Sequence, residues 1–261
     1  MSSDIAVNFS CSGHVAYIAL NRPEVSNSLN LESLYLLRKT LKEVRSRSDI
    51  WIICFTGTGD KVFCAGADLK ERKNMSAAEV ETFVLEIRTT MNEIAQLPQP
   101  TLAAINGHAF GGGCELSLSC DLRLIQSNSL IGLTETSLAI IPGAGGCVRL
   151  PRLIGSAKAK EMILLSKRLT AEEALDCGLV HQVAEPKDFS KVRNQLLKQL
   201  LSNGPLALKA AKLAIDGSED LSLKEALQHE SACYEKIIPT SDRLEALAAF
   251  SEKRKPKFTG N

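Results

Sequence analysis

One carboxylate lies in an apolar stretch of this chain, where acidic side chains are unusual. Glu115 follows three consecutive glycines, Gly111–Gly113, within the run GGGCELSLSC. Because this run is apolar nearly all round, it predicts a buried helix. Burying an ionised carboxylate without partners is costly or raises its pKa. Glu115 is therefore either a structural acid held by a salt bridge or a group that does chemistry.

The glycines beside Glu115 favour chemistry. They lack Cβ atoms, so the free N–H groups at the start of a helix can approach a ligand closely, and the helix dipole there favours negative charge. That arrangement is half of an oxyanion hole, although the same glycines would also suit close helix packing. A second donor is available in the loop FCAGAD, where the backbone N–H of Ala67 lies between a strand and a helix.

A second acid follows twenty positions later. Glu135 is the one acidic residue in IGLTETSLAIIPGAGG, a neutral and mostly apolar segment that ends in a glycine-rich loop. Two carboxyl groups close to a pair of N–H donors would suit acid and base catalysis beside an oxyanion hole.

The elements that must position these residues follow from hydrophobic patterning and turn signals. Apolar runs predict short strands at residues 5–9, 14–20, 51–56, 101–105 and 122–126. Apolar residues at helical spacing predict a helix over residues 30–46 and another from Ser76, which forms a capping box with Glu79, to Pro98. Strands alternating with helices through short connections indicate an α/β layer fold.

After Pro151 the pattern becomes mostly helical. Helices are expected at residues 156–165, 170–177, 189–201, 205–215, 222–236 and 241–252, with a strand candidate at Leu179–Val183. No flexible linker is recognisable, so we expect this part to pack on the α/β core. We place the core at residues 1–200 and a C-terminal helical region at residues 201–261.

The composition excludes several classes of protein. Of 261 residues, 44% are hydrophobic and 23% charged, as in a globular protein, and the net charge of +1 gives no footprint for nucleic acid or a membrane surface. The eight cysteines form no CxxC pair, which is typical of buried free thiols in a reducing compartment. The four histidines lack metal-ligand spacing, so no metal site is expected.

No membrane span or targeting leader is expected either. No apolar run reaches the ~18 residues of a membrane span, and MSSDIAVNFS has neither a secretory nor an Arg-rich leader pattern. We therefore expect a cytoplasmic protein if the source is bacterial, and a mitochondrial matrix protein with its presequence removed if the source is eukaryotic.

Five motifs in order resemble the crotonase (enoyl-CoA hydratase/isomerase) superfamily, and together they span nearly the whole chain. They are NRPEVSNSL, FCAGADLKE, NGHAFGGGCEL, ETSLAIIPGAGG and FSEKRKPKF. The resemblance implies a crotonase (ClpP-like) α/β spiral of ββα units, followed by an α-helical C-terminal trimerisation region that completes the active site.

The resemblance also implies roles for the residues singled out above. The oxyanion-hole amides fall on Ala67 and Gly112, and the catalytic acids on Glu115 and Glu135. Members that carry both acids look like hydratases, which add water across the 2,3 double bond of a short-chain 2-enoyl-CoA thioester. Glu115 would be the base and Glu135 the acid. No cofactor is implied, because coenzyme A is part of the substrate.

Contacts with CoA are implied at two places. The family loop near the adenine is matched by Ala65, Asp68, Leu69 and Lys70. Phe250 and Lys253 match positions that reach CoA from a neighbouring subunit, in a hexamer built as a dimer of trimers. Glu24 stands where family members often carry a Lys for the CoA phosphate.

Other functions stay open at this point. The motifs at residues 68–80 and 232–245 look most like the branch that contains the AU-rich-RNA-binding methylglutaconyl-CoA hydratase. RNA contact in that branch is attributed to lysines that match Leu31, Tyr35 and Lys39; one lysine remains here, so RNA is not an expected partner. A Δ3,Δ2-enoyl-CoA isomerase, which needs one acid, and a non-catalytic binding protein are the remaining alternatives.

Overall fold

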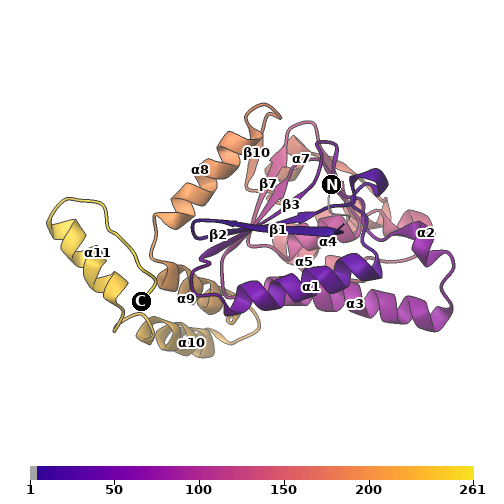
Figure 1. The fold of residues 1–261 in the computed structure, drawn as a ribbon. Helices are drawn as coiled ribbons and strands as arrows, with labels where there is room; N and C mark the ends of the chain where they lie inside the picture. Colours follow the sequence, from indigo (N-terminus) through magenta and orange to yellow (C-terminus); the bar gives the residue numbers. More distant parts are fainter. Residues whose placement is uncertain (1–4) are drawn as a thin grey trace.

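The computed structural model describes residues 5–261, and its larger sheet forms the centre of the fold (Figure 1). This sheet has the strand order β1-β2-β3-β5-β7-β10. The strands are β1 Val7–Ser12, β2 Val15–Leu20, β3 Ile52–Gly57, β5 Thr101–Ile105, β7 Leu122–Gln126 and β10 Gln182–Ala184. β1 and β2 are antiparallel, and all later neighbours are parallel. All five residues of β5 are buried, as expected for a parallel strand covered on both faces.

A smaller sheet of very short strands lies in the order β4-β6-β8-β9. These are β4 Val62–Cys64, β6 His108–Phe110, β8 Leu130–Gly132 and β9 Leu169–Thr170. The chain passes from a strand of the large sheet to one of the small sheet and then to a helix, as in β3-β4-α2, β5-β6-α4 and β7-β8-α5. This repetition confirms the α/β spiral of ββα units. The sequence patterning did not predict the small sheet, because two or three residues carry no periodicity.

The helices of the first half cover the sheet and carry the site. They are α1 Leu31–Ser46, α2 Leu69–Arg72, α3 Ala77–Ala95, α4 Gly112–Leu118 and α5 Gly146–Ile154, with the short 3₁₀ turns η1 Pro23–Val25 and η2 Glu135–Leu138. α1 and α3 lie side by side (Figure 1). Their apolar stripes are buried, and the capping box predicted for Ser76 and Glu79 begins α3. α4 is buried at every position, as its sequence predicts.

The helices of the second half are arranged less compactly than expected. They are α6 Ser156–Leu164, α7 Ala171–Asp176, α8 Phe189–Leu201, α9 Pro205–Asp216, α10 Leu223–Glu235 and α11 Ser241–Ser251. Lys212 ties α9 to the core through an ion pair of 2.9 Å with Asp121. α10 and α11 extend away from the sheet (Figure 1), so the prediction that the whole helical half packs on the core was wrong for these two helices. Division of the chain between residues 200 and 201, at the last residue of α8, stays a prediction.

Three smaller expectations need correction. The last strand of the large sheet begins at Gln182 rather than Leu179, because Leu179 is buried in the turn before it. α5 was not predicted, since Pro151, which lies inside it, was interpreted as a boundary. Of the eight free cysteines, five are buried, but Cys11 and Cys147 are exposed.

No helix within residues 5–261 has both the length and the apolar character that crossing a membrane requires. The interpretation of the N-terminus as lacking a leader rests partly on residues 1–4, which lie outside the described residues.

Candidate active site

A single β-bridge fixes the direction of the backbone N–H of Ala67. Leu29 pairs with Ala67, since the Leu29 N–H donates to Gly66 O at 2.7 Å and the Asp68 N–H donates to Leu29 O at 2.8 Å. Successive backbone groups of an extended segment point to opposite sides. The N–H of Ala67 therefore points away from Leu29. It has no acceptor among the described residues.

A second free N–H lies next to it at the start of α4. Gly112 is the first residue of this helix, so its N–H has no intrahelical acceptor, and none is found elsewhere in residues 5–261. A Cβ placed on Gly112 would lie 3.8 Å from the nitrogen of Ala67, and one placed on Gly66 would lie 3.1 Å from the nitrogen of Gly112. The two N–H groups are thus neighbours and form a pair of donors without acceptors.

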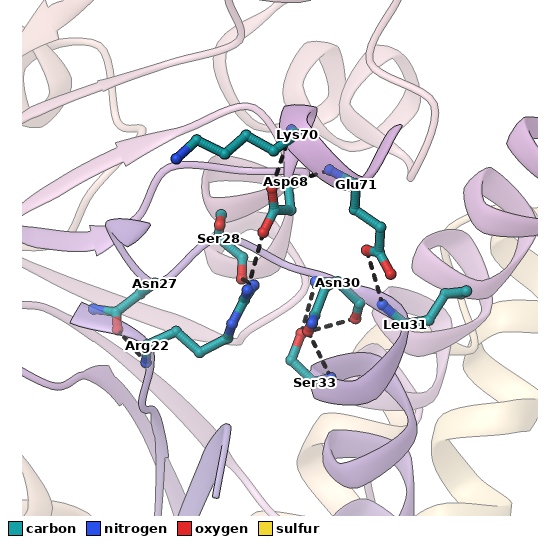
Figure 2. Close-up of polar contacts among 9 residues, drawn as sticks. All are labelled: Arg22, Asn27, Ser28, Asn30, Leu31, Ser33, Asp68, Lys70 and Glu71. Atoms are coloured by element: carbon teal, nitrogen blue, oxygen red, sulfur yellow. Dashed lines mark hydrogen bonds and ion pairs between the residues drawn. The ribbon is translucent and has the colours of Figure 1, made fainter. Parts of the chain in front are cut away.

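The loop that carries Ala67 is braced by polar contacts, which Figure 2 shows. Arg22 Nη2 donates to Asp68 Oδ2 at 3.0 Å, and its Nη1 donates to Ser28 O at 2.8 Å. Asp68 Oδ1 accepts the backbone N–H of Lys70 at 3.1 Å, at the start of α2. Burial would raise the pKa of Asp68, but Arg22 and the α2 amides together hold it below its usual value. The carboxylate of Asp68 thus ties the loop to the segment before α1.

Glu115 lies one turn into α4 and is 3% exposed. Its Oε1 accepts two backbone N–H groups, from Ala144 at 2.7 Å and from Gly146 at 2.9 Å. Burial raises its pKa, whereas these two amides and the nearby guanidinium groups of Arg149 and Arg88 favour the ionised form. The structure therefore gives Glu115 several partners that stabilise a carboxylate.

Glu135 has the opposite environment. It begins η2, and its Oε2 is buried with no hydrogen-bond partner among the described residues. A Cβ on Gly111 would lie 3.3 Å from its Oε1, which places this carboxyl group against the glycine turn. Burial and the neighbouring Glu115 charge raise the pKa of Glu135 to about 7. Glu135 is therefore the group of the pair that favours its protonated form near neutral pH.

The two backbone donors and the two acids face one pocket of about 490 Å³. It is lined by the two donor residues Ala67 and Gly112, by both acids, and by Thr134. An apolar wall comes from Phe83, Val84, Ile87, Leu138, Ile140 and Ile141. The pocket thus combines a place for a developing negative charge, two carboxyl groups and room for an apolar chain.

Comparison with known proteins agrees with this geometry. The profile of the family described as Enoyl-CoA hydratase/isomerase matches residues 10–261. The chain belongs to the enoyl-CoA hydratase/isomerase family. A crystal structure of an enoyl-CoA hydratase from Bacillus anthracis is 46% identical and superposes with a TM-score of 0.96, covering 98% of this chain and all of that one.

Two human proteins are similar to this chain over almost the same span. Mitochondrial methylglutaconyl-CoA hydratase is 44% identical over 250 residues, which cover 94% of this chain and 74% of that protein. The mitochondrial enoyl-CoA hydratase domain-containing protein 2 is 44% identical over 251 residues, which cover 94% of this chain and 86% of that protein.

The residues predicted to contact CoA lie in different surroundings in the structure. Ala65 and Leu69 line the pocket, whereas Asp68 is 8% exposed and engaged by Arg22. The side chain of Lys70 extends away from that pair (Figure 2) and is exposed. Phe250, on α11, is 86% exposed.

Lys253 follows α11 with a left-handed φ of 54°. α11 and α2 lie at opposite ends of the molecule (Figure 1), so α11 does not complete the pocket of its own chain.

Sequence patterning missed two features of the site. The amides of Ala144 and Gly146, which bind Glu115, lie in the glycine-rich stretch that leads into α5, and no contact with an acid was predicted for it. Arg88 lines the pocket, yet it directly follows the buried Ile87 in the helical pattern and was assigned to no site. Only the position of α3 relative to residues 138–144 brings it there.

Proposed function

We propose that this protein is a hydratase that adds water across the 2,3 double bond of a short-chain 2-enoyl-CoA thioester. The observation that carries the proposal is the presence of Glu115, Glu135 and two unpaired backbone N–H groups in one pocket. A protein that only binds a partner has no need of this set.

The two N–H groups would act on the thioester oxygen. Attack of water on C3 pushes the π electrons through C2 toward that oxygen, which becomes enolate-like. Fixed donors from Ala67 and Gly112 stabilise this charge, and the loss of one such donor costs about 3 kcal/mol in transition-state stabilisation.

The two acids would handle the protons in opposite roles. Glu115, whose ionised form is favoured by the amides of Ala144 and Gly146, takes a proton from water as its oxygen bonds to C3. Glu135, whose pKa is raised to about 7, gives its proton to C2. The product is a 3-hydroxyacyl-CoA, and proton exchange through water returns both acids to their starting states.

The remaining proposals concern binding and assembly. Ala65 and Leu69 at the pocket, with Lys70 beside them, would contact CoA, and no further cofactor takes part in the steps above. The exposed apolar side chains of α11, Phe250 among them, support assembly as a hexamer in which Phe250 and Lys253 reach a neighbouring subunit's CoA. Leu31, Tyr35 and Lys39 carry one positive charge on α1, so we propose no RNA-binding role.

A branched, acidic methylglutaconyl group is the second candidate for the acyl chain. The observation that favours it is an arginine, Arg88, in the pocket wall. The similarity to human methylglutaconyl-CoA hydratase supports the same candidate. Relatives named as mitochondrial support a mitochondrial location if the source is eukaryotic, and we propose the matrix.

The test separates hydration from isomerisation. Wild-type protein is incubated with crotonyl-CoA, 3-methylglutaconyl-CoA and a 3-enoyl-CoA. Hydration is detected by mass spectrometry, and isomerisation, which leaves the mass unchanged, is detected by the ultraviolet absorbance of the conjugated 2-enoyl thioester. A hydratase adds the mass of one water to a 2-enoyl-CoA. Conversion of the 3-enoyl-CoA to its 2-enoyl isomer, with no hydration of either 2-enoyl-CoA, would contradict the proposal and favour the isomerase.

A further inference from the structure

The wall of the pocket is mostly apolar and carries two cations, Arg72 and Arg88. From the donor pair at Ala67, the pocket passes Glu115 and reaches the loop at Gly143 and Ala144, where Arg88 of α3 also lines it. The neighbouring residues of this wall are aliphatic or aromatic. A charged group in such a wall is costly to desolvate when a neutral ligand fills the pocket, so it calls for a partner of opposite charge.

The guanidinium of Arg88 is held in place by one hydrogen bond, and its other donors remain free among the described residues. Its Nε donates to Gly143 O at 2.9 Å, directly before the residue whose amide binds Glu115. Its Nη1 and Nη2 have no acceptor among residues 5–261, and the side chain is exposed. An anchored Nε with two free Nη groups leaves a fork that can accept a carboxylate.

Position along the pocket distinguishes Arg88 from the other arginine that lines it. Arg88 is tied to the loop that binds Glu115, because its Nε donates to Gly143 O and the next residue, Ala144, donates its amide to Glu115. Arg72 ends α2, the short helix that follows the predicted CoA loop. Arg88 therefore lies beside the loop that binds Glu115, whereas Arg72 lies beside the predicted CoA loop.

We propose that Arg88 selects an acyl chain that ends in a carboxylate, so that the preferred substrate is the mono-CoA thioester of a short unsaturated dicarboxylic acid. This inference rests on the proposed function, because the thioester oxygen must sit on the Ala67 and Gly112 amides for the far end to reach Arg88. A neutral chain of the same length would bury the guanidinium without a partner.

The test compares two 2-enoyl-CoA substrates of similar length, glutaconyl-CoA with a terminal carboxylate and 2-hexenoyl-CoA without one. Wild type should prefer glutaconyl-CoA. Arg88→Gln should lower kcat/KM for glutaconyl-CoA by about 10- to 100-fold, mainly through KM, because a hydrogen-bonded ion pair is lost. Its loss on 2-hexenoyl-CoA should be much smaller, since on that substrate Arg88 acts only through its charge beside Glu115. Arg88→Lys should recover part of the preference, since it restores the charge without the fork.

Arg149 provides the matched control. Its Nη1 donates to Ala144 O at 3.2 Å and its charge also favours the ionised form of Glu115, yet it does not line the pocket. Arg149→Gln should therefore affect both substrates alike, which isolates the effect on Glu115 from recognition of a carboxylate.

Three results would overturn the inference. Wild type should discriminate between the two substrates, so equal turnover of both contradicts the inference. Equal losses on both substrates in Arg88→Gln would show that Arg88 acts through Glu115, and a selective loss in Arg72→Gln with Arg88→Gln unaffected would move the contact to α2. Hydration of neither substrate by wild type would overturn the proposed function and this inference with it.

Discussion

Glu115 and Glu135 share one pocket but differ in their hydrogen bonds. Glu115 Oε1 accepts two backbone N–H groups, from Ala144 and Gly146, whereas Oε2 of Glu135 is buried without a partner among the described residues. Hydrogen bonds to an ionised carboxylate favour that form, and burial without them disfavours it. The same side chain therefore suits a base at one position and an acid at the other.

The first prediction concerns the pH dependence of turnover. Because Glu135 must carry a proton to deliver it, and its pKa is raised to about 7, kcat/KM should fall as the pH rises through about 7. The two acids are coupled, so the fitted value belongs to the pair. The measurement is kcat/KM for hydration across about pH 5 to 9. A rate independent of pH on the alkaline side would contradict the role given to Glu135.

The second prediction concerns stability. A carboxyl group whose pKa is raised in the folded state destabilises the protein once the unfolded chain can ionise, and the penalty is complete only above the folded pKa of about 7. Glu135→Gln removes this penalty. Its Tm should therefore exceed that of wild type by more at pH 8 than at pH 5. The measurement is thermal unfolding of both proteins at the two pH values, and an equal difference at both would show that Glu135 ionises freely in the fold.

The third prediction tests the close approach of the two donor loops. Gly66 has a φ of 94°, and a Cβ there would lie 3.0 Å from Phe110 O and 3.1 Å from the nitrogen of Gly112. Gly66→Ala should lower kcat/KM by about 100-fold or more, since small misplacement of catalytic groups has effects of that size.

Gly59→Ala is the matched control for Gly66→Ala. Its φ of 90° imposes similar strain, but its Cβ would meet only a Pro23 side-chain atom at 3.7 Å. Gly59→Ala should lose about 1–3 kcal/mol of stability and keep its turnover. Equal activity in the two variants would show that the spacing of the donor loops does not matter.

The fourth prediction concerns the brace shown in Figure 2. Asp68→Asn keeps an oxygen for the Lys70 amide but removes the charge that pairs with Arg22. We expect kcat for hydration to fall about tenfold with little change in KM, because the Ala67 amide is less well held. Arg47→Gln, which breaks an exposed ion pair with Asp49, is the control and should leave kcat unchanged. If Asp68→Asn kept the wild-type kcat, the ion pair between Asp68 and Arg22 would have no role in holding the Ala67 amide.

Whether a helix or strand of the fold could be predicted from the sequence depended on its length. Long periodic segments such as α1 and α3 were predicted within a few residues, and the buried β5 was found from its apolar run. β4, β6 and β8 were missed because each has three residues and gains its stability from neighbours far along the chain.

The site shows the same division between local and long-range information. Glu115 and Glu135 stood out because acids in apolar segments are unusual. Arg88 did not, because an arginine beside a helical apolar stripe is normally a solvated side chain. Its position in the pocket depends on contacts between α3 and residues 138–144, which local patterning does not contain. The brace of Asp68 by Arg22 was missed for the same reason.

The most direct test of the two-acid account is the turnover of Glu115→Gln and Glu135→Gln on crotonyl-CoA and 3-methylglutaconyl-CoA, with thermal unfolding to verify that both variants fold. Each substitution nearly preserves shape but removes a group that exchanges protons. The account predicts that each variant loses about 10²- to 10⁴-fold in kcat on whichever substrate wild type hydrates. Wild-type turnover in either folded variant would contradict the account.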